Sequence, residues 1–142
     1  MLSVPLVITL ITNLFYSSKN LNQDQIRHIA WNLLNQAEEF YLTQNKIGFG
    51  NLLAEDMIFD YCGTIHNKSE NIQNMPTEIS SWTAHFINGT FDGKNLVYYI
   101  EQRKFCPIVK HNLTIPYIHK AKRLKSGKFL WTFKKILITC EN

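Results

Sequence analysis

The clearest pattern in the chain is a run of apolar residues spaced three and four apart between positions 26 and 41. This spacing places them on one face of an α-helix, while the opposite face is polar and charged. Asn22 and Gln25 have the spacing of a capping box just before the run. The sequence therefore predicts a long helix that packs one face inward. That face consists of Ile26, Ile29, Ala30, Leu33, Leu34, Ala37, Phe40 and Tyr41.

Two shorter helices are predicted next, with a strand between them. Apolar residues within 48–55 predict a second helix, and the alternation from 57 to 62 predicts a strand. A third helix is predicted over 68–75, with Ser69 as its N-cap and Pro76 as the residue that stops it.

Four strands are predicted in the remainder, because apolar and polar residues alternate from position 82 onward. Asp92 and Gly93 predict a hairpin between the first two strands, and the polar residues 123–128 predict the turn before the last. The alternating residues are Trp82, Ala84 and Phe86, then Leu96, Tyr98 and Ile100, then Leu113, Ile115 and Tyr117, and finally Phe129, Trp131 and Phe133.

The last two strands each contain an irregularity. After Phe133 the apolar positions change parity and resume at Ile136, which predicts a β-bulge across Lys134 and Lys135. Pro116 lies inside the third strand and cannot donate to a ladder, so it predicts an edge or an irregularity there. A bulged strand bends, and a bent sheet can wrap around helices.

Composition agrees with one folded domain of the α+β class. The chain has 142 residues, of which 45% are hydrophobic and 13% aromatic, enough to fill a core. No internal repeat, linker or low-complexity run divides it. Charge is uneven, since residues 1–93 carry four basic and nine acidic side chains, whereas residues 94–142 carry eleven and two.

The N-terminal residues bear on the compartment. Residues 3–16 are largely apolar, and no charged side chain precedes Lys19. The stretch is shorter than the roughly 20 residues that span a bilayer, but it suits the apolar region of a secretory signal. We predict a signal peptide over 1–18 and a secreted, extracellular domain over 19–142. The alternative is a buried first β-strand, because β-branched residues are frequent here.

Glycosylation patterns and cysteines are weaker indicators of the compartment. The three acceptor patterns, where chance alone gives about two, begin at Asn67, Asn88 and Asn112. No Cys-x-x-Cys pair occurs, which argues against a zinc site. One disulfide with one free thiol would suit a secreted chain, and three buried thiols would suit the cytosol. The three cysteines are Cys62, Cys106 and Cys140.

The order of elements, with two helices, a strand pair, a short helix and a four-strand meander, resembles the nuclear transport factor 2-like superfamily. The resemblance covers about residues 22–142. An aromatic strand ending in Cys62, a Gly turn and a helix start at Lys68-Ser69-Glu70 are similar to a secreted animal branch of it. The resemblance implies a cone, in which N-terminal helices pack on a curved, mainly antiparallel sheet.

The resemblance has two further implications. The strand over 57–62 would lie near the last strand, so a Cys62–Cys140 disulfide is the preferred pairing and Cys106 is free, with three unpaired thiols as the alternative. Enzymes of the superfamily place a carboxylate or a His, with a Tyr, inside the cone. No position here matches a catalytic motif, so we predict no catalytic residue, cofactor or metal site.

The first functional hypothesis is a pocket inside the cone for a small apolar ligand, such as a lipid or a sterol-like molecule. The alternative is that aromatic side chains fill the cone completely, and a buried His119 or Asp60 would favour the pocket. The predicted pocket residues are Tyr98, Tyr117, His119 and Trp131. Further aromatic residues expected around them are Trp82, Phe86, Phe129, Phe133, Phe40 and Tyr41.

The second hypothesis is a basic hairpin that binds polyanions, such as heparin-like glycans or anionic lipid. A signal peptide argues against intracellular nucleic acid, and no aromatic residue lies within 120–128 to stack on bases. The alternative is a solvated turn whose lysines keep sheet edges from pairing. The hairpin residues are Lys120, Lys122, Arg123, Lys125 and Lys128, with Lys134 and Lys135 further along.

The third hypothesis, a small enzyme, is the least favoured. Acid–base chemistry needs its groups within hydrogen-bond reach in a cleft, which spacing alone does not establish. The motifs of zinc proteases, serine hydrolases and phosphate-binding loops are absent from the sequence. Residues of suitable type are Asp60, His66, His85, Tyr98, Glu101, His111 and His119. The sequence therefore favours a non-catalytic role, either ligand binding or extracellular interaction.

Overall fold

The computed structural model describes residues 20–77, 82–106 and 110–138. The predicted signal peptide and Cys140 lie outside these residues, as do the side chains of Trp82, Cys106 and His111. Within the described part, no helix is both long and apolar enough to cross a membrane.

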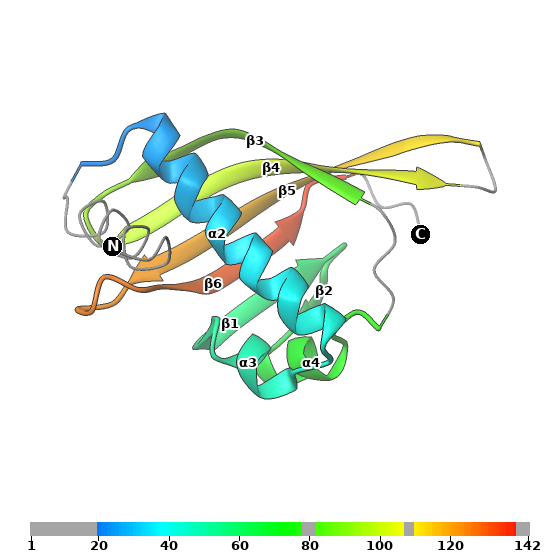
Figure 1. Ribbon diagram of the computed structural model, residues 1–142, viewed down its shortest axis with the longest axis horizontal. Helices are drawn as coiled ribbons and strands as arrows, with labels where there is room; N and C mark the ends of the chain where they lie inside the picture. The colour runs from blue at the N-terminus through cyan, green and yellow to red at the C-terminus, as the bar shows by residue number, and fades with distance from the viewer. Residues whose placement is uncertain (1–19, 78–81, 107–109, 139–142) are drawn as a thin grey trace, which may run out of the picture.

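The predicted long helix is confirmed as α2, Gln23–Leu42. Asn22 caps it, and Gln25 closes the predicted capping box by bonding back to the Asn22 backbone. The apolar face is buried at Ile26, Ile29, Ala30, Leu33 and Ala37. Figure 1 shows that α2 crosses one face of the sheet diagonally, while α3 and α4 lie near its C-terminal end.

Two of the predicted helix boundaries are wrong. The second helix, α3, covers only Lys46–Gly50, and the chain enters a strand at Leu53 instead of continuing to residue 55. The reason is sheet pairing, since the Leu52 carbonyl accepts a hydrogen bond from the Trp131 backbone amide at 2.9 Å. Tertiary pairing here overrides a short local pattern.

The third helix, α4, covers Lys68–Gln73, and its N-cap is Asn67 instead of Ser69. Asn67 has the extended backbone of a cap, and its side chain accepts from the Glu70 amide at 2.9 Å. The Glu70 side chain accepts from the Asn67 amide, which completes a second capping box.

Six strands form one curved sheet in the order β2-β1-β6-β5-β4-β3. All neighbouring pairs are antiparallel except β1 and β6, which are parallel. The α+β class and the mainly antiparallel sheet are therefore as predicted. The strands are β1 Leu53–Tyr61, β2 Thr64–His66, β3 Trp82–Phe91, β4 Asn95–Cys106, β5 His111–Arg123 and β6 Phe129–Ile136.

A bulge in β6 is present, but it lies earlier than predicted. Lys134 is opposite His119 and Trp131 is opposite Ala121, so three steps along β6 match two steps along β5. The extra residue therefore precedes Lys134. In consequence Phe133 turns to the outer face of the sheet, and Lys134 shares the inner face with Trp131.

Pro116 lies where the sequence analysis required it. It pairs with Glu101 of β4 on one side. On the other side the pairing of β5 with β6 ends at Tyr117 and Ile136, one residue before Pro116 is reached. Pro116, which has no backbone N–H to donate, thus lies where β5 extends beyond its regular pairing with β6.

Candidate functional site

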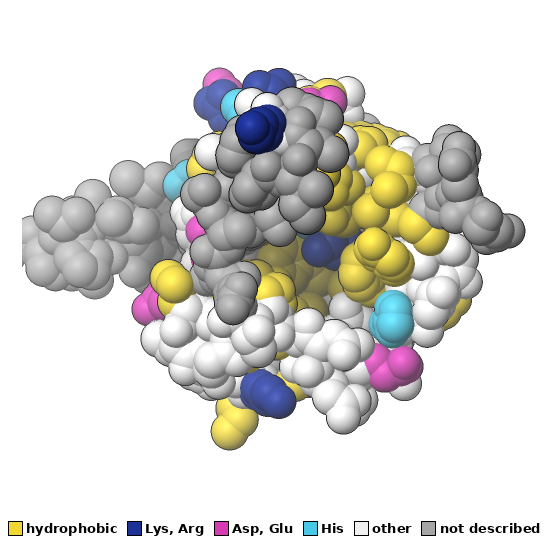
Figure 2. Space-filling view, turned by 90° about the vertical axis from the view of Figure 1, so that its right-hand side faces the viewer, with side chains coloured by type: hydrophobic (Ala, Val, Ile, Leu, Met, Phe, Trp, Pro, Cys, Tyr) yellow, Lys and Arg dark blue, Asp and Glu magenta, His cyan; other side chains and the backbone are white. Residues whose placement is uncertain are grey.

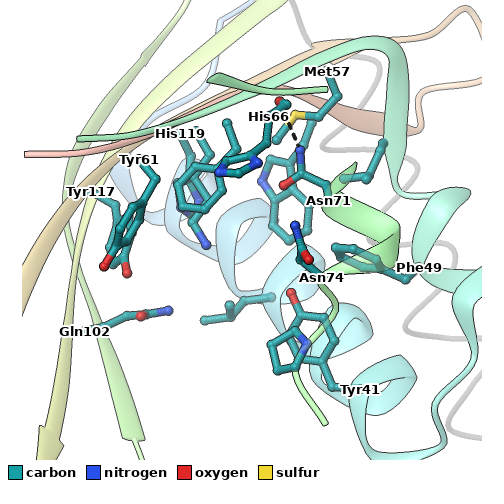
Figure 3. Close-up of a pocket in the computed structure, with 16 residues that line it drawn as sticks. Tyr41, Phe49, Met57, Tyr61, His66, Asn71, Asn74, Gln102, Tyr117 and His119 are labelled. Atoms are coloured by element: carbon teal, nitrogen blue, oxygen red, sulfur yellow. Dashed lines mark hydrogen bonds between the residues drawn. The ribbon is translucent and has the colours of Figure 1, made fainter. Parts of the chain in front are cut away.

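The concave face of the sheet is not filled completely, because a cavity of about 420 Å³ remains between the sheet and the helices and is open to solvent. Residues of α2, α3, β1, β2, α4, β4, β5 and β6 line it (Figure 3). Its size falls in the range of small-molecule sites. Much of the wall is apolar or aromatic, formed by Leu34, Tyr41, Phe49, Leu53, Met57 and Phe59.

The face that Figure 2 presents is hollowed. Hydrophobic side chains surround the hollow, and Lys or Arg atoms are visible deep within it. Lys134 is the one Lys or Arg among the described residues that line the cavity. The cavity is therefore an apolar space with one cationic side chain in its wall.

The Lys134 ammonium lies between two aromatic rings. Its Nζ is 4.9 Å from the ring centre of Phe59 and 4.8 Å from that of Tyr117. Such cation–π contacts replace part of the lost hydration. Desolvation nevertheless lowers the pKa of Lys134 from 10.5 to about 8, so most of the side chain is charged at neutral pH.

His119 lines the same cavity and is 3% exposed, the only polar or charged residue in the buried core of the described residues. Its Nδ1 lies 3.1 Å from the hydroxyl of Tyr98, and the Trp131 indole donates to that hydroxyl at 2.7 Å. Burial, and next the nearby Lys134 charge, lower the pKa of His119 well below its usual value. The ring is therefore neutral at pH 7.

The hydrogen bonds of Tyr98 decide which His119 nitrogen carries the proton. The indole of Trp131 can only donate, so the fully buried Tyr98 proton finds its acceptor at His119 Nδ1. This assigns the remaining proton to Nε2. His119 Nε2 is buried without a hydrogen-bond partner among the described residues. A buried donor in this state costs about 1–3 kcal/mol until a partner arrives.

His66 is the second histidine of the wall. Its Nδ1 lies 3.5 Å from the Glu70 carboxylate but has no hydrogen-bond partner in the described residues. Its carbonyl accepts from the Asn71 side chain at 3.3 Å (Figure 3). Asn71, Asn74 and Gln102 add polar groups to the lining.

Three of the four residues predicted for the pocket line it, namely Tyr117, His119 and Trp131. Tyr98 is 1% exposed and lies behind the wall, where it holds His119 and Trp131. Asp60, whose burial would also have favoured a pocket, is partly exposed, and its carboxylate lies 3.8 Å from the Lys135 ammonium. Of the pocket's two predicted helical residues, Tyr41 lines the cavity and Phe40 does not.

Lys134 is the charged residue of the pocket wall that the sequence analysis missed, since it was grouped with the basic hairpin. The signal was present in the parity change. Ile136 is buried, and alternation places the residue two positions before it on the same face. Phe133, expected near the pocket, instead packs under Lys120 on the outer face, at 5.1 Å from ring centre to Nζ.

The basic hairpin residues do not share one face. Lys120 and Lys122 alternate with Ala121 and Arg123 along β5, and Arg123 stacks 5.2 Å above the Phe91 ring. Lys128 reaches the Asn51 carbonyl at 3.3 Å, and Lys125 is exposed. This division spreads the positive charge over both sides of the sheet.

The predicted modification sites are accessible where they are described. Asn67, Asn88 and Asn112 are all exposed. Cys62 is disulfide-bonded. Cys140 lies outside the described residues, so its pairing with Cys62 stays a prediction.

The acid–base candidates are scattered. Only His66 and His119 of that set line the cavity, and no Asp or Glu is among the described residues of its wall. Glu101 and His85 pair with each other across β3 and β4, away from the cavity. Nor does any group of three or more His, Cys, Asp or Glu able to hold a metal occur within the described residues.

Comparison with known proteins identifies the fold. The chain matches an NTF2-like protein from Cytophaga hutchinsonii with a TM-score of 0.62 and 15% identity, covering 82% of this chain and 98% of that one. An NTF-2 like protein of unknown function from Shewanella oneidensis gives 0.60 and 9%, covering 78% and 97%. A candidate ketosteroid isomerase from Shewanella frigidimarina gives 0.59 and 10%, covering 76% and 94%.

These similarities show that the chain has the nuclear transport factor 2-like fold, as the order of elements predicted. No protein-family model and no curated protein matches the sequence. At identities this low the comparisons establish the fold, and the site has to be interpreted from its own residues.

Proposed function

We propose that the chain is a non-catalytic binding protein whose cavity takes one small, mainly apolar ligand. The observation that carries the proposal is the open cavity of about 420 Å³ with a largely aromatic and aliphatic wall. Ligand sites are typically concave and apolar with a few placed polar groups, and here those groups are His119 and Lys134. A solid core would have left no such space.

The chemistry of the wall supports binding over catalysis. The described wall offers two imidazoles, of which that of His119 is neutral, an ammonium group, tyrosine hydroxyls and side-chain amides, but no Asp or Glu that could serve as a general base. The ring of His119 is also held by Tyr98, which uses the Nδ1 lone pair. This set can orient a ligand by charge and by hydrogen bonds, and it lacks a carboxylate to act on it as a base.

Nile red, a neutral dye that fluoresces in apolar surroundings, tests the proposal. We expect saturable binding of one dye per chain. Leu34→Trp adds bulk from α2 into the cavity and should weaken binding at least tenfold. Ile47→Trp is the matched control, because Ile47 is 81% exposed on α3 and does not line the cavity.

Two outcomes would contradict the proposal. The first is no saturable dye binding by the wild-type chain. The second is equal binding by wild type and Leu34→Trp, after circular dichroism has shown that both variants are folded, because the dye would then occupy another surface.

We propose further that the domain acts outside the cell. The apolar stretch at residues 3–16, the three exposed acceptor asparagines and the disulfide at Cys62 support this, since disulfides persist in oxidising compartments. Expression of the full chain in a secretory host, followed by intact mass with and without glycosidase and reductant, tests it. An uncleaved chain retained in the cell with three free thiols would refute it.

A further inference from the structure

We propose that the ligand of this cavity carries an anionic head group, a carboxylate on an apolar tail, and that the Lys134 ammonium binds it. The inference rests on the proposed function and names the class of ligand. It follows from the charge of the wall, from an unpartnered donor beside it, and from the depth of the charged group in the hollow.

The first argument is that Lys134 lies in a mainly apolar space and has no acidic partner within the described residues. Its ammonium group contacts the ring faces of Phe59 and Tyr117. The neighbouring charged residues Lys135 and Asp60 lie on the other face of the sheet. They pair with each other there, with the Lys135 ammonium 3.8 Å from the Asp60 carboxylate. An ammonium so placed has lost hydration without gaining a counter-ion, and a ligand carboxylate would supply one.

The second argument comes from His119. Its Nε2 proton has no partner among the described residues, and the imidazole is opposite Lys134 in the pairing of β5 with β6. A carboxylate has two oxygens, so one can accept from the ammonium and the other from Nε2–H. A single head group would therefore satisfy both groups, whereas a hydroxyl of an alcohol offers no charge.

The third argument concerns the tail. Lys or Arg atoms lie deep in the hollow of Figure 2, and hydrophobic side chains surround them. A head group bound at Lys134 would leave its tail against the apolar wall, which on the helical side includes Phe49 and Tyr41 (Figure 3), together with Leu34 of α2. An amphipathic monocarboxylic acid matches this order of charge and apolar surface.

Displacement of Nile red by dodecanoic acid and by dodecanol separates charge recognition from apolar binding. Both probes have the same tail and are used below their aggregation concentrations. We expect the acid to compete at least tenfold better than the alcohol at pH 7 with the wild-type chain, as one well-placed charge contact provides. Lys134→Met should abolish that preference while leaving the alcohol unaffected, and Lys134→Arg should keep it.

Lys120→Met is the matched control, because Lys120 belongs to the adjacent strand and contacts an aromatic ring on the outer face. We expect it to retain the wild-type preference. Equal competition by acid and alcohol in the wild type, or a preference that survives in Lys134→Met, would overturn the inference and leave the proposed function standing. Failure of both probes and of the dye to bind would overturn the proposed function itself.

Discussion

At the scale of single residues, a lysine on the inner face of the sheet is the unusual feature. An inward Lys134 costs solvation that two aromatic rings restore only in part. The sequence could have revealed its direction, since alternation counted back from Ile136 puts it inside. It could not have revealed the cavity, because aromatic residues with this spacing more often fill a solid core than line a pocket.

The cost of Lys134 should appear in the pH dependence of stability. The folded-state pKa of about 8 lies below the ordinary 10.5, so between these values the unfolded chain holds a proton that the folded chain has released. Stability therefore rises with pH through this window. Lys134→Met should raise the free energy of unfolding by about 1–3 kcal/mol at pH 7, and the gain should shrink by pH 10.

Urea unfolding of wild type and Lys134→Met at pH 7 and pH 10 measures this difference. Tyr41 and Tyr98, whose pKa values burial raises, are present in both chains and cancel in the comparison. Lys120→Met controls for loss of a charge from the outer face. A Lys134→Met variant that is less stable than wild type at pH 7 would contradict the claim that Lys134 is desolvated on the inner face of the sheet.

At the scale of elements, the long helix, the hairpin between β3 and β4 and the strand alternation could be predicted from the local sequence pattern. Asn22 and Gln25 formed the predicted box, and Asp92 formed the turn by accepting from the Lys94 and Asn95 amides. The extent of α3 and the parallel pairing of β1 with β6 did not follow from it. Both depend on contacts between segments about 75 residues apart, such as Leu52 with Trp131.

Docking of α2 on the sheet depends on Gly89 of β3. The Gln23 side chain exchanges two hydrogen bonds with the Gly89 backbone, at 2.7 and 3.0 Å. A Cβ at position 89 would lie 2.8 Å from Ile26 Cγ2 and 2.8 Å from the Val97 carbonyl oxygen. The helix start and the strand therefore approach too closely for any side chain at this position.

Gly89→Ala should accordingly lower the free energy of unfolding by about 2–3 kcal/mol through overpacking. Elsewhere the same substitution is often mildly stabilising, because it reduces the freedom of the unfolded chain. Thr90→Ala, on the next and exposed residue, is the control for urea unfolding. A Gly89→Ala chain as stable as the wild type would show that α2 does not pack this closely on β3.

At the scale of the whole molecule, the fold combines a curved sheet, a diagonal helix and a cavity that opens to solvent between them (Figures 1 and 2). The fold class was predictable because the order of helices and strands is fixed by local periodicity. The open space depends instead on contacts between residues distant in sequence, such as the hydrogen bond from Trp131 of β6 to Tyr98 of β4.

Emission from Trp131 gives the most direct measurement of whether a ligand enters this cavity. Trp131 lines it, whereas Trp31 is 44% exposed on α2, so Trp31→Phe with Trp82→Phe leaves one reporter inside. Titration with dodecanoic acid should change the Trp131 emission saturably, with one molecule bound per chain. Emission that stays constant, while calorimetry or the dye reports binding, would place the ligand elsewhere and contradict the account.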